Sequence, residues 1–183
     1  MYCHNVYDAD GNKTNSLFWL EFELDEVTKK YAFQYLVDDK VQVSDPYSKV
    51  ILDPWNDKEL SRYLEGEGLP AYPEKGDGLV SILQIEDENP YQWEVTDFKA
   101  PKKEDLNIYE LCVRDFVSNK RLSNIQENYL DYIEKLGVNA IELMPVSEFD
   151  GNNSWGYDPN HYFAYDKAYG NKNEYKAFID ECH

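Results

Sequence analysis

The sequence has few of the residues from which several classes of protein are built. Its three cysteines, Cys3, Cys112 and Cys182, are too few and too far apart for a disulfide framework or a zinc site. No apolar run is long enough for a membrane-spanning helix, and the first residues lack the basic and then apolar order of a signal peptide. We therefore expect a soluble chain, and the sequence does not indicate its cellular compartment.

Basic residues are also scarce. The chain has 18 Lys and Arg residues against 36 Asp and Glu residues, which gives a formal net charge of −18. Such a surface repels phosphate backbones and anionic lipids, so we expect neither nucleic acid nor a membrane as a partner. Aromatic residues, in contrast, make up 15% of the chain, with 16 tyrosines among them. Aromatic rings suit neutral sugars, although packing in the core explains the count equally well.

The first part of the chain has the alternating pattern of antiparallel strands. Apolar side chains recur at every second position of "LFWLEFEL" (17–24) and "YAFQYLV" (31–37). A stretch rich in glycine and proline (65–78) predicts a loop, and "KAPKKED" (99–105) predicts a linker between domains. Two further strands are predicted at 41–43 and 79–85.

The second part alternates between strands and helices. The apolar runs at 107–113 and 138–144 are typical of strands that are buried on both faces. A helical stripe of Ile125, Tyr129, Tyr132, Ile133 and Leu136 predicts a helix over 123–136.

The ends of this helix have their own signals. Ser123 and Gln126 form a potential capping box, and Gly137 is a natural C-terminal stop. A second helix is predicted from Asn173 to residue 183, with Tyr175, Phe178, Ile179 and Cys182 on its apolar face. This alternation predicts parallel strands joined by a right-handed crossover, and a functional site beyond the carboxyl ends of those strands.

Several motifs of this second part are specific in combination. "IYELCVRDF" (108–116) is similar to a first barrel strand, "LGVNAIELMPV" (136–146) to a second strand that ends at a proline, and "WGYDP" (155–159) to the aromatic loop after it. Through them the segment 106–183 resembles the first two β/α units of the α-amylase family, glycoside hydrolase family thirteen. The stretch 31–57 resembles the end of the β-sandwich module that precedes the barrel in starch-degrading members.

The expected fold is therefore mixed. It is a partial antiparallel β-sandwich followed by the first β-α-β-α units of a (β/α)8 TIM barrel. We expect three segments: a sandwich-like domain with the following loop and strand (1–98), a linker (99–105) and the N-terminal part of an α-amylase-type barrel (106–183).

The resemblance also implies an activity. Members of the family are retaining glycoside hydrolases acting on α-glucans, with a nucleophilic Asp, an acid/base Glu and a second Asp on the fourth, fifth and seventh strands. These strands are expected beyond residue 183, so we expect no catalytic residue within the chain and no activity from it alone. The alternatives are a non-catalytic carbohydrate-binding or interaction module, or a debranching or transferring member of the same family.

The resemblance places two candidate substrate-binding residues in the aromatic loop. It implies that Tyr157 lies against the sugar ring at the site of cleavage, whereas a structural tyrosine would pack beneath the loop. Trp155 either lines the cleft or holds the loop, and Gly156 lets the backbone turn between them. The expected partner is an α-glucan oligosaccharide or polysaccharide. No metal or cofactor is expected, and a truncated barrel is expected to self-associate through its open strand edge.

The other polar candidates have structural interpretations. Arg114 and Asp115 are expected to hydrogen-bond each other or the neighbouring strand. We expect Glu142, Glu148 and Asp150 to be non-catalytic, with solvated positions favoured for the acidic residues of so acidic a chain. The histidines lack the spacing of metal ligands, so His161 and His183 are expected to be solvated or capping, and His4 to lie in a frayed terminus.

Overall fold

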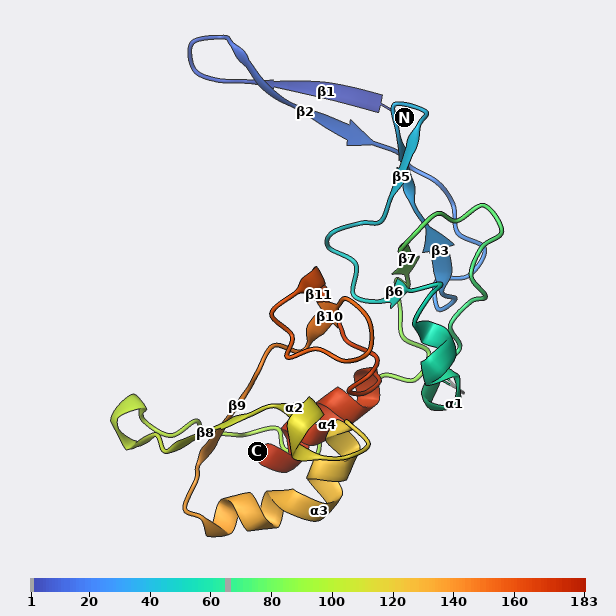
Figure 1. Cartoon of the computed structure of the whole chain (residues 1–183). Coiled ribbons are helices and arrows are strands. Elements are labelled where there is room, and N and C mark those ends of the chain that lie inside the picture. Colours follow the sequence, from blue (N-terminus) through green and yellow to red (C-terminus); the bar gives the residue numbers. More distant parts are fainter. Residues whose placement is uncertain (1, 65–66) are drawn as a thin grey trace.

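The first part of the chain is built from small antiparallel sheets. The computed structural model describes residues 2–64 and 67–183 (Figure 1). A hairpin projects away from the rest of the chain, and a three-stranded sheet encloses a small core of Leu52, Val80 and Ile82. The strands of the hairpin are β1 (Tyr2–Tyr7) and β2 (Lys13–Trp19); those of the sheet, in spatial order, are β3 (Tyr31–Phe33), β7 (Val80–Leu83) and β6 (Ile51–Leu52); and β4 (Tyr35–Val37) pairs with β5 (Val41–Val43).

The strand predictions for this part are confirmed at 41–43 and largely at 79–85. The strand predicted over 31–37 is confirmed only in part, because Gln34 divides it into β3 and β4, which belong to different sheets. The prediction for 17–24 is wrong beyond Trp19, because the partner strand β1 starts at Tyr2, directly opposite Trp19. His4 pairs with Leu17 inside β1 and does not lie in a frayed terminus. Two short helices, η1 (Asp57–Leu60) and α1 (Ser61–Leu64), precede the predicted loop, whose residues 65 and 66 lie outside the described residues.

The second part contains a parallel pair of strands. β8 (Ile108–Leu111) and β9 (Ala140–Leu143) pair in register from Ile108 opposite Ala140 to Leu111 opposite Leu143, and α3 (Leu122–Lys135) connects them. The predicted parallel pairing is therefore confirmed. The remaining elements are η2 (Lys103–Asp105), α2 (Val113–Phe116), β10 (Ser147–Phe149), β11 (Pro159–Tyr165) and α4 (Lys172–Cys182).

The start of α3 differs from the sequence prediction. The residue before the helix is Arg121, which makes no side-chain cap, and the Ser123 hydroxyl instead donates a hydrogen bond to Glu174 at 2.8 Å. The predicted capping box of Ser123 and Gln126 is therefore wrong. A capping box does form at α4, where Asn171 and Glu174 satisfy each other's backbone N–H groups, so this helix starts one residue earlier than predicted. Gly137, at φ +81°, follows the end of α3 as predicted.

The main core lies between the parallel pair and the two long helices, which pack against each other (Figure 1). Ile125 and Ile133 of the predicted stripe are buried, but Tyr132 and Leu136 are exposed. On α4 only Phe178 of the predicted apolar face is fully buried, and Ile179 and Cys182 are exposed. The buried members of this core are Leu60, Leu111, Val113, Val117, Leu122, Ile125, Ile133, Phe149, Ala168, Tyr169 and Phe178.

The segment before the predicted linker is fixed to α4. The Asp180 carboxylate accepts hydrogen bonds from the Tyr91 hydroxyl at 2.9 Å and from the backbone N–H groups of Glu94 and Val95 at 2.8 and 2.9 Å. The ring of Phe98 stacks on His183, with 3.9 Å between the centroids. Residues 91–98 therefore connect the two parts along the surface of α4. The mixed fold with antiparallel sheets in its first part is confirmed.

Candidate functional site

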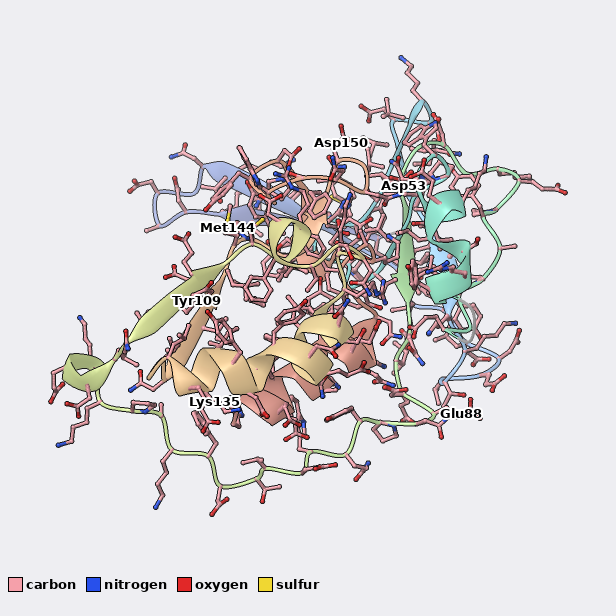
Figure 2. The ribbon with its side chains drawn as sticks, turned by 60° about the horizontal axis from the view of Figure 1, so that its bottom comes forward. Asp53, Glu88, Tyr109, Lys135, Met144 and Asp150 are labelled. Carbon is pink, nitrogen blue, oxygen red and sulfur yellow. The ribbon has the colours of Figure 1, made fainter. Side chains whose placement is uncertain are left out.

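The two parallel strands end at the same edge. The backbone N–H of Met144 donates to the carbonyl of Leu111 at 2.9 Å, so the residues that follow β8 and β9 start side by side. In Figure 2, Met144 and Asp150 lie toward one end of the parallel pair and Lys135 toward the other. Arg114 and Asp115 follow the first strand, and the loop 150–158 follows β10, which continues from the second. This edge is where parallel sheets place their functional loops.

Trp155 contacts both residues that follow the first strand. Its indole N–H donates to Asp115 at 2.8 Å, and the Arg114 guanidinium lies 4.7 Å from the centroid of its ring. Arg114 and Asp115 form a two-point ion pair at 2.7 and 3.0 Å, as expected for residues that support each other. The Arg114 guanidinium and the Trp155 N–H together lower the pKa of Asp115 to about 2. Trp155 is thereby held in place while 54% of its surface remains exposed.

Tyr157 is more exposed still, at 66%. Its ring does not pack beneath the loop, which was the structural alternative considered for it. Both predicted substrate-binding residues therefore lie at the surface, two positions apart, beyond the carboxyl ends of the strands. Their contact with a sugar remains a prediction.

The backbone between the two aromatic residues has little freedom. Gly156 has φ +90°, and a Cβ at this position would lie 1.9 Å from the carbonyl oxygen of Pro145. Only glycine fits this turn, as the sequence indicated. The Ser154 hydroxyl accepts the Gly156 N–H at 2.9 Å and donates to Asp158, and the Tyr169 hydroxyl donates to the Ser154 carbonyl at 2.6 Å.

Ser154 and Tyr169 were not singled out from the sequence. Tyr169 is separated in sequence from the loop that it supports. From the sequence alone, Ser154 looks like an ordinary loop residue. A signal for Ser154 was present in "GNNSWG", where a serine stands two residues before a glycine. A serine hydroxyl at this spacing can accept a hydrogen bond from the backbone N–H of its own turn.

The loop also touches the first part of the chain. The Asn152 amide donates to the carbonyl of Asn56 at 2.9 Å, and Lys120 donates to Asn153 at 2.7 Å. The position of the aromatic loop therefore depends on contacts with the η1 region as well as with the segment before α3.

A buried charged cluster lies behind the loop. Glu148 is only 4% exposed and accepts a hydrogen bond from Lys167 at 2.6 Å, and Asp57 lies 3.4 Å from the same ammonium group. The expectation that Glu148 is solvated is wrong, because β10 turns its side chain inward against Lys167. Burial raises the pKa of Glu148 to about 8, and Asp166 adds to this effect.

His161 is also buried, contrary to the expectation of a solvated or capping residue. Its Nε2 lies 2.8 Å from the Ser44 hydroxyl, and burial lowers its pKa. This contact joins β11 to the first part of the chain. Within residues 2–64 and 67–183, no group of three or more His, Cys, Asp or Glu side chains is arranged to hold a metal ion. None of the helices in these same ranges is long and apolar enough to cross a membrane.

Comparison with known proteins shows which family the chain resembles. Residues 122–183 match the family model for the alpha amylase catalytic domain, which takes in the aromatic loop, β9 and both long helices. The resemblance predicted from the sequence is therefore confirmed, and the chain is related to the α-amylase family.

Individual relatives agree with this assignment. The chain is 31% identical to a malto-oligosyltrehalose trehalohydrolase of Saccharolobus solfataricus over 87% of its own length and 24% of that protein. It is 29% identical to a 1,4-alpha-glucan branching enzyme of Pseudoalteromonas atlantica, over 84% of its own length and 22% of that protein. A crystal structure of a Salmonella typhimurium protein provisionally assigned as an alpha amylase superposes with a TM-score of 0.62 at 28% identity, over 83% of this chain and 22% of that one. The chain thus spans about a quarter of the length of these relatives.

Proposed function

We propose that this chain is part of a retaining α-amylase-type enzyme that acts on α-glucans, and that Trp155 and Tyr157 bind the sugar. In this proposal β8, α3, β9 and α4 are the first units of a (β/α)8 barrel, residues 99–105 are the linker, and 1–98 are the sandwich-like domain. The observation that supports the proposal most strongly is that Trp155 and Tyr157 expose their rings at the carboxyl edge of the parallel pair, with the Trp155 ring fixed by Asp115 and the backbone between them fixed at Gly156.

Rigid aromatic rings contribute to sugar binding in two ways. They cover the apolar face of a sugar ring without losing much conformational freedom, because the loop is already ordered. They also fix the orientation of the ring, which helps catalysis when the contact is stronger in the transition state than in the ground state.

The chemical step needs carboxylates that this site does not offer. A retaining mechanism uses two carboxyl groups about 5 Å apart, one as nucleophile and one as acid/base. Three of the acids near the aromatic loop are engaged otherwise: Asp115 by Arg114 and Trp155, Asp158 by Ser154, and Glu148 by Lys167. Asp150, in the loop itself, is exposed, and we assign it to neither role. We propose that residues 1–183 bind the substrate and release no reducing sugar from soluble starch, and turnover above that of a mock purification would refute this.

Binding can be tested on the chain itself. Affinity electrophoresis in gels that contain amylopectin measures whether a neutral α-glucan retards the protein. We expect retardation of the wild-type chain and a clear loss in Trp155→Ala and Tyr157→Ala. Tyr132→Ala is the matched control, since Tyr132 is an exposed tyrosine on α3, away from the loop. Unchanged retardation in both loop variants would contradict the proposed role of these residues.

Transfer is the second candidate reaction, because a branching enzyme is among the relatives. Hydrolysis raises the number of reducing ends, whereas branching changes linkages without doing so. A reducing-end assay on an enzyme that contains this chain together with the remaining barrel strands would separate the two reactions.

A further inference from the structure

A groove lies between the two parts of the chain. It has a volume of about 540 Å³, which is in the range of clefts that hold small ligands. One wall comes from β3, the end of β7 and the turn that precedes β6, and the other from β11. None of its lining residues belongs to the loop 150–158, so this groove does not share the proposed contacts of Trp155 and Tyr157.

Two exposed aromatic rings flank this groove. Tyr47 lies between β5 and β6, and Phe163 lies on β11. Their ring centroids are 5.1 Å apart with an angle of 34° between the planes, and the two residues are 70% and 52% exposed. Each part of the chain supplies one of the rings. Together they form an aromatic surface beside a hollow, which is what a sugar ring needs for stacking.

The charges around the groove are balanced. Three lysines and three acids line it, although acidic residues outnumber basic ones twofold in the whole chain. Lys172 is paired with Asp87, and the Lys49 ammonium lies 5.2 Å from the centroid of the Phe163 ring. An anionic ligand would meet the carboxylates and a cationic ligand the lysines, so the lining favours a neutral ligand that offers many hydroxyl groups. The charged lining residues are Lys30, Lys49, Lys172, Asp45, Glu86 and Asp87.

We propose that this groove binds a second stretch of a neutral α-glucan chain. Tyr47 and Phe163 stack on sugar rings, and Lys49 and Asp45 hydrogen-bond the hydroxyl groups beside them. The proposal rests on the proposed function, from which it takes the class of ligand. Two points of contact on one polysaccharide raise the overall affinity, because the second binds at a high effective concentration. Long glucans should therefore bind the chain more tightly than short oligosaccharides do.

The test uses the 183-residue chain in amylopectin gels, with maltotriose as the short ligand in calorimetry. In Tyr47→Ala/Phe163→Ala we expect at least about a fivefold loss of apparent affinity for amylopectin, as a bivalent contact becomes monovalent. Tyr162→Ala is the matched control, because Tyr162 is an aromatic neighbour on the same strand, 75% exposed, and does not line the groove. Tyr47→Ala alone serves if the double variant does not fold, since Tyr47 lies in an exposed loop.

The outcomes separate this proposal from the proposed function. The Tyr47 variants are the double variant and Tyr47→Ala alone. If amylopectin retards them as strongly as the wild-type chain, the groove proposal is overturned. An equal loss of retardation in Tyr162→Ala overturns it as well. If Trp155→Ala and Tyr157→Ala lose retardation while the Tyr47 variants keep it, the proposed function stands and the groove does not bind glucan. If only the Tyr47 variants lose it, the groove binds glucan by itself, and both the two-point contact and the role assigned to the aromatic loop are wrong.

Discussion

The indole N–H of Trp155 donates a hydrogen bond to Asp115, 2.8 Å away, and so joins the loop 150–158 to α2, the short helix that follows β8. Asp115 is an acceptor for both Arg114 and Trp155, and Arg114 in turn lies against the Trp155 ring. The orientation of the ring thus depends on a carboxylate that we do not expect to touch the sugar. Asp115 is a positioning residue for the proposed binding site.

Replacing Asp115 should therefore weaken glucan binding without unfolding the chain. We expect Asp115→Ala to lower the affinity for a maltooligosaccharide about threefold to tenfold, the effect of losing one orienting hydrogen bond. Asp115→Asn keeps an acceptor and should lose less. Calorimetric titration measures the affinities, and the melting temperature should change little because the side chain is half exposed. A large fall in melting temperature with unchanged affinity would show that Asp115 serves stability only.

The second prediction concerns the turn between the aromatic residues. Gly156 and Gly151 both have positive φ, of +90° and +78°, but only at Gly156 would a Cβ strike another atom. Gly151→Ala is thus a matched control that reports the backbone strain alone, about 1 kcal/mol. Gly156→Ala adds the clash with the Pro145 carbonyl and should cost about 1 to 3 kcal/mol more. Urea denaturation measures both, and equal losses would mean that the loop moves away from Pro145 without cost.

The sequence predicted the elements whose cause is local. The helix predicted over 123–136 and found over 122–135, its stop at Gly137 and the two parallel strands all follow from patterns within a few residues. The turn at Gly156 was also predictable, because the motif places a glycine between two aromatic residues, whereas the exposure of those rings was left open by the sequence.

Three of the errors share one cause, which is a partner on another element of the fold. His161 is buried because it meets Ser44, 117 positions earlier, and Glu148 because it meets Lys167. The hydroxyl of Ser123 bonds Glu174 of another helix instead of capping its own. Polar residues with such partners look solvated in a sequence read by itself, so the buried charges behind the site were missed.

The third prediction is a dependence of stability on pH through Glu148. Burial raises its pKa from 4.5 to about 8 in the folded chain, so the folded state binds this proton more tightly than the unfolded state does. The resulting stabilisation is complete below about pH 4.5 and is lost as the pH rises toward 8. The slope from one such group is at most about 1.4 kcal/mol per pH unit.

Glu148→Gln tests this directly. Glutamine is uncharged at every pH and can still accept the hydrogen bond from Lys167. Thermal unfolding at intervals between pH 5 and 8.5 should show a falling stability in the wild-type chain and a flatter profile in the variant. The comparison also removes the effect of the negative net charge on stability, because the wild-type chain and the variant differ in charge only at residue 148. Parallel profiles would show that Glu148 remains charged throughout this range.

The last prediction concerns the open side of the parallel pair. A groove of about 720 Å³ lies beside β9, α3 and α4, and it is lined mainly by apolar side chains, among them Ile141, Leu143 and Ile179. Leu111 of β8 and Val113 of α2 are buried within the chain, but Ile141 and Leu143 are only partly covered. Each large aliphatic side chain left in water forgoes about 1.5 to 3 kcal/mol of burial. We therefore expect the chain to self-associate through this groove and the free edge of β9.

Light scattering over a range of concentrations measures this association. The apparent mass should rise with concentration in the wild-type chain and remain that of a monomer in Ile179→Glu, which places a charge in the groove. Tyr132→Glu adds the same charge to an exposed position on α3 that does not line the groove, so it should associate like the wild type. A concentration-independent monomer mass for the wild-type chain would contradict the prediction. It would mean that the groove is stable in water, with its half-buried side chains sufficiently covered by α3 and α4.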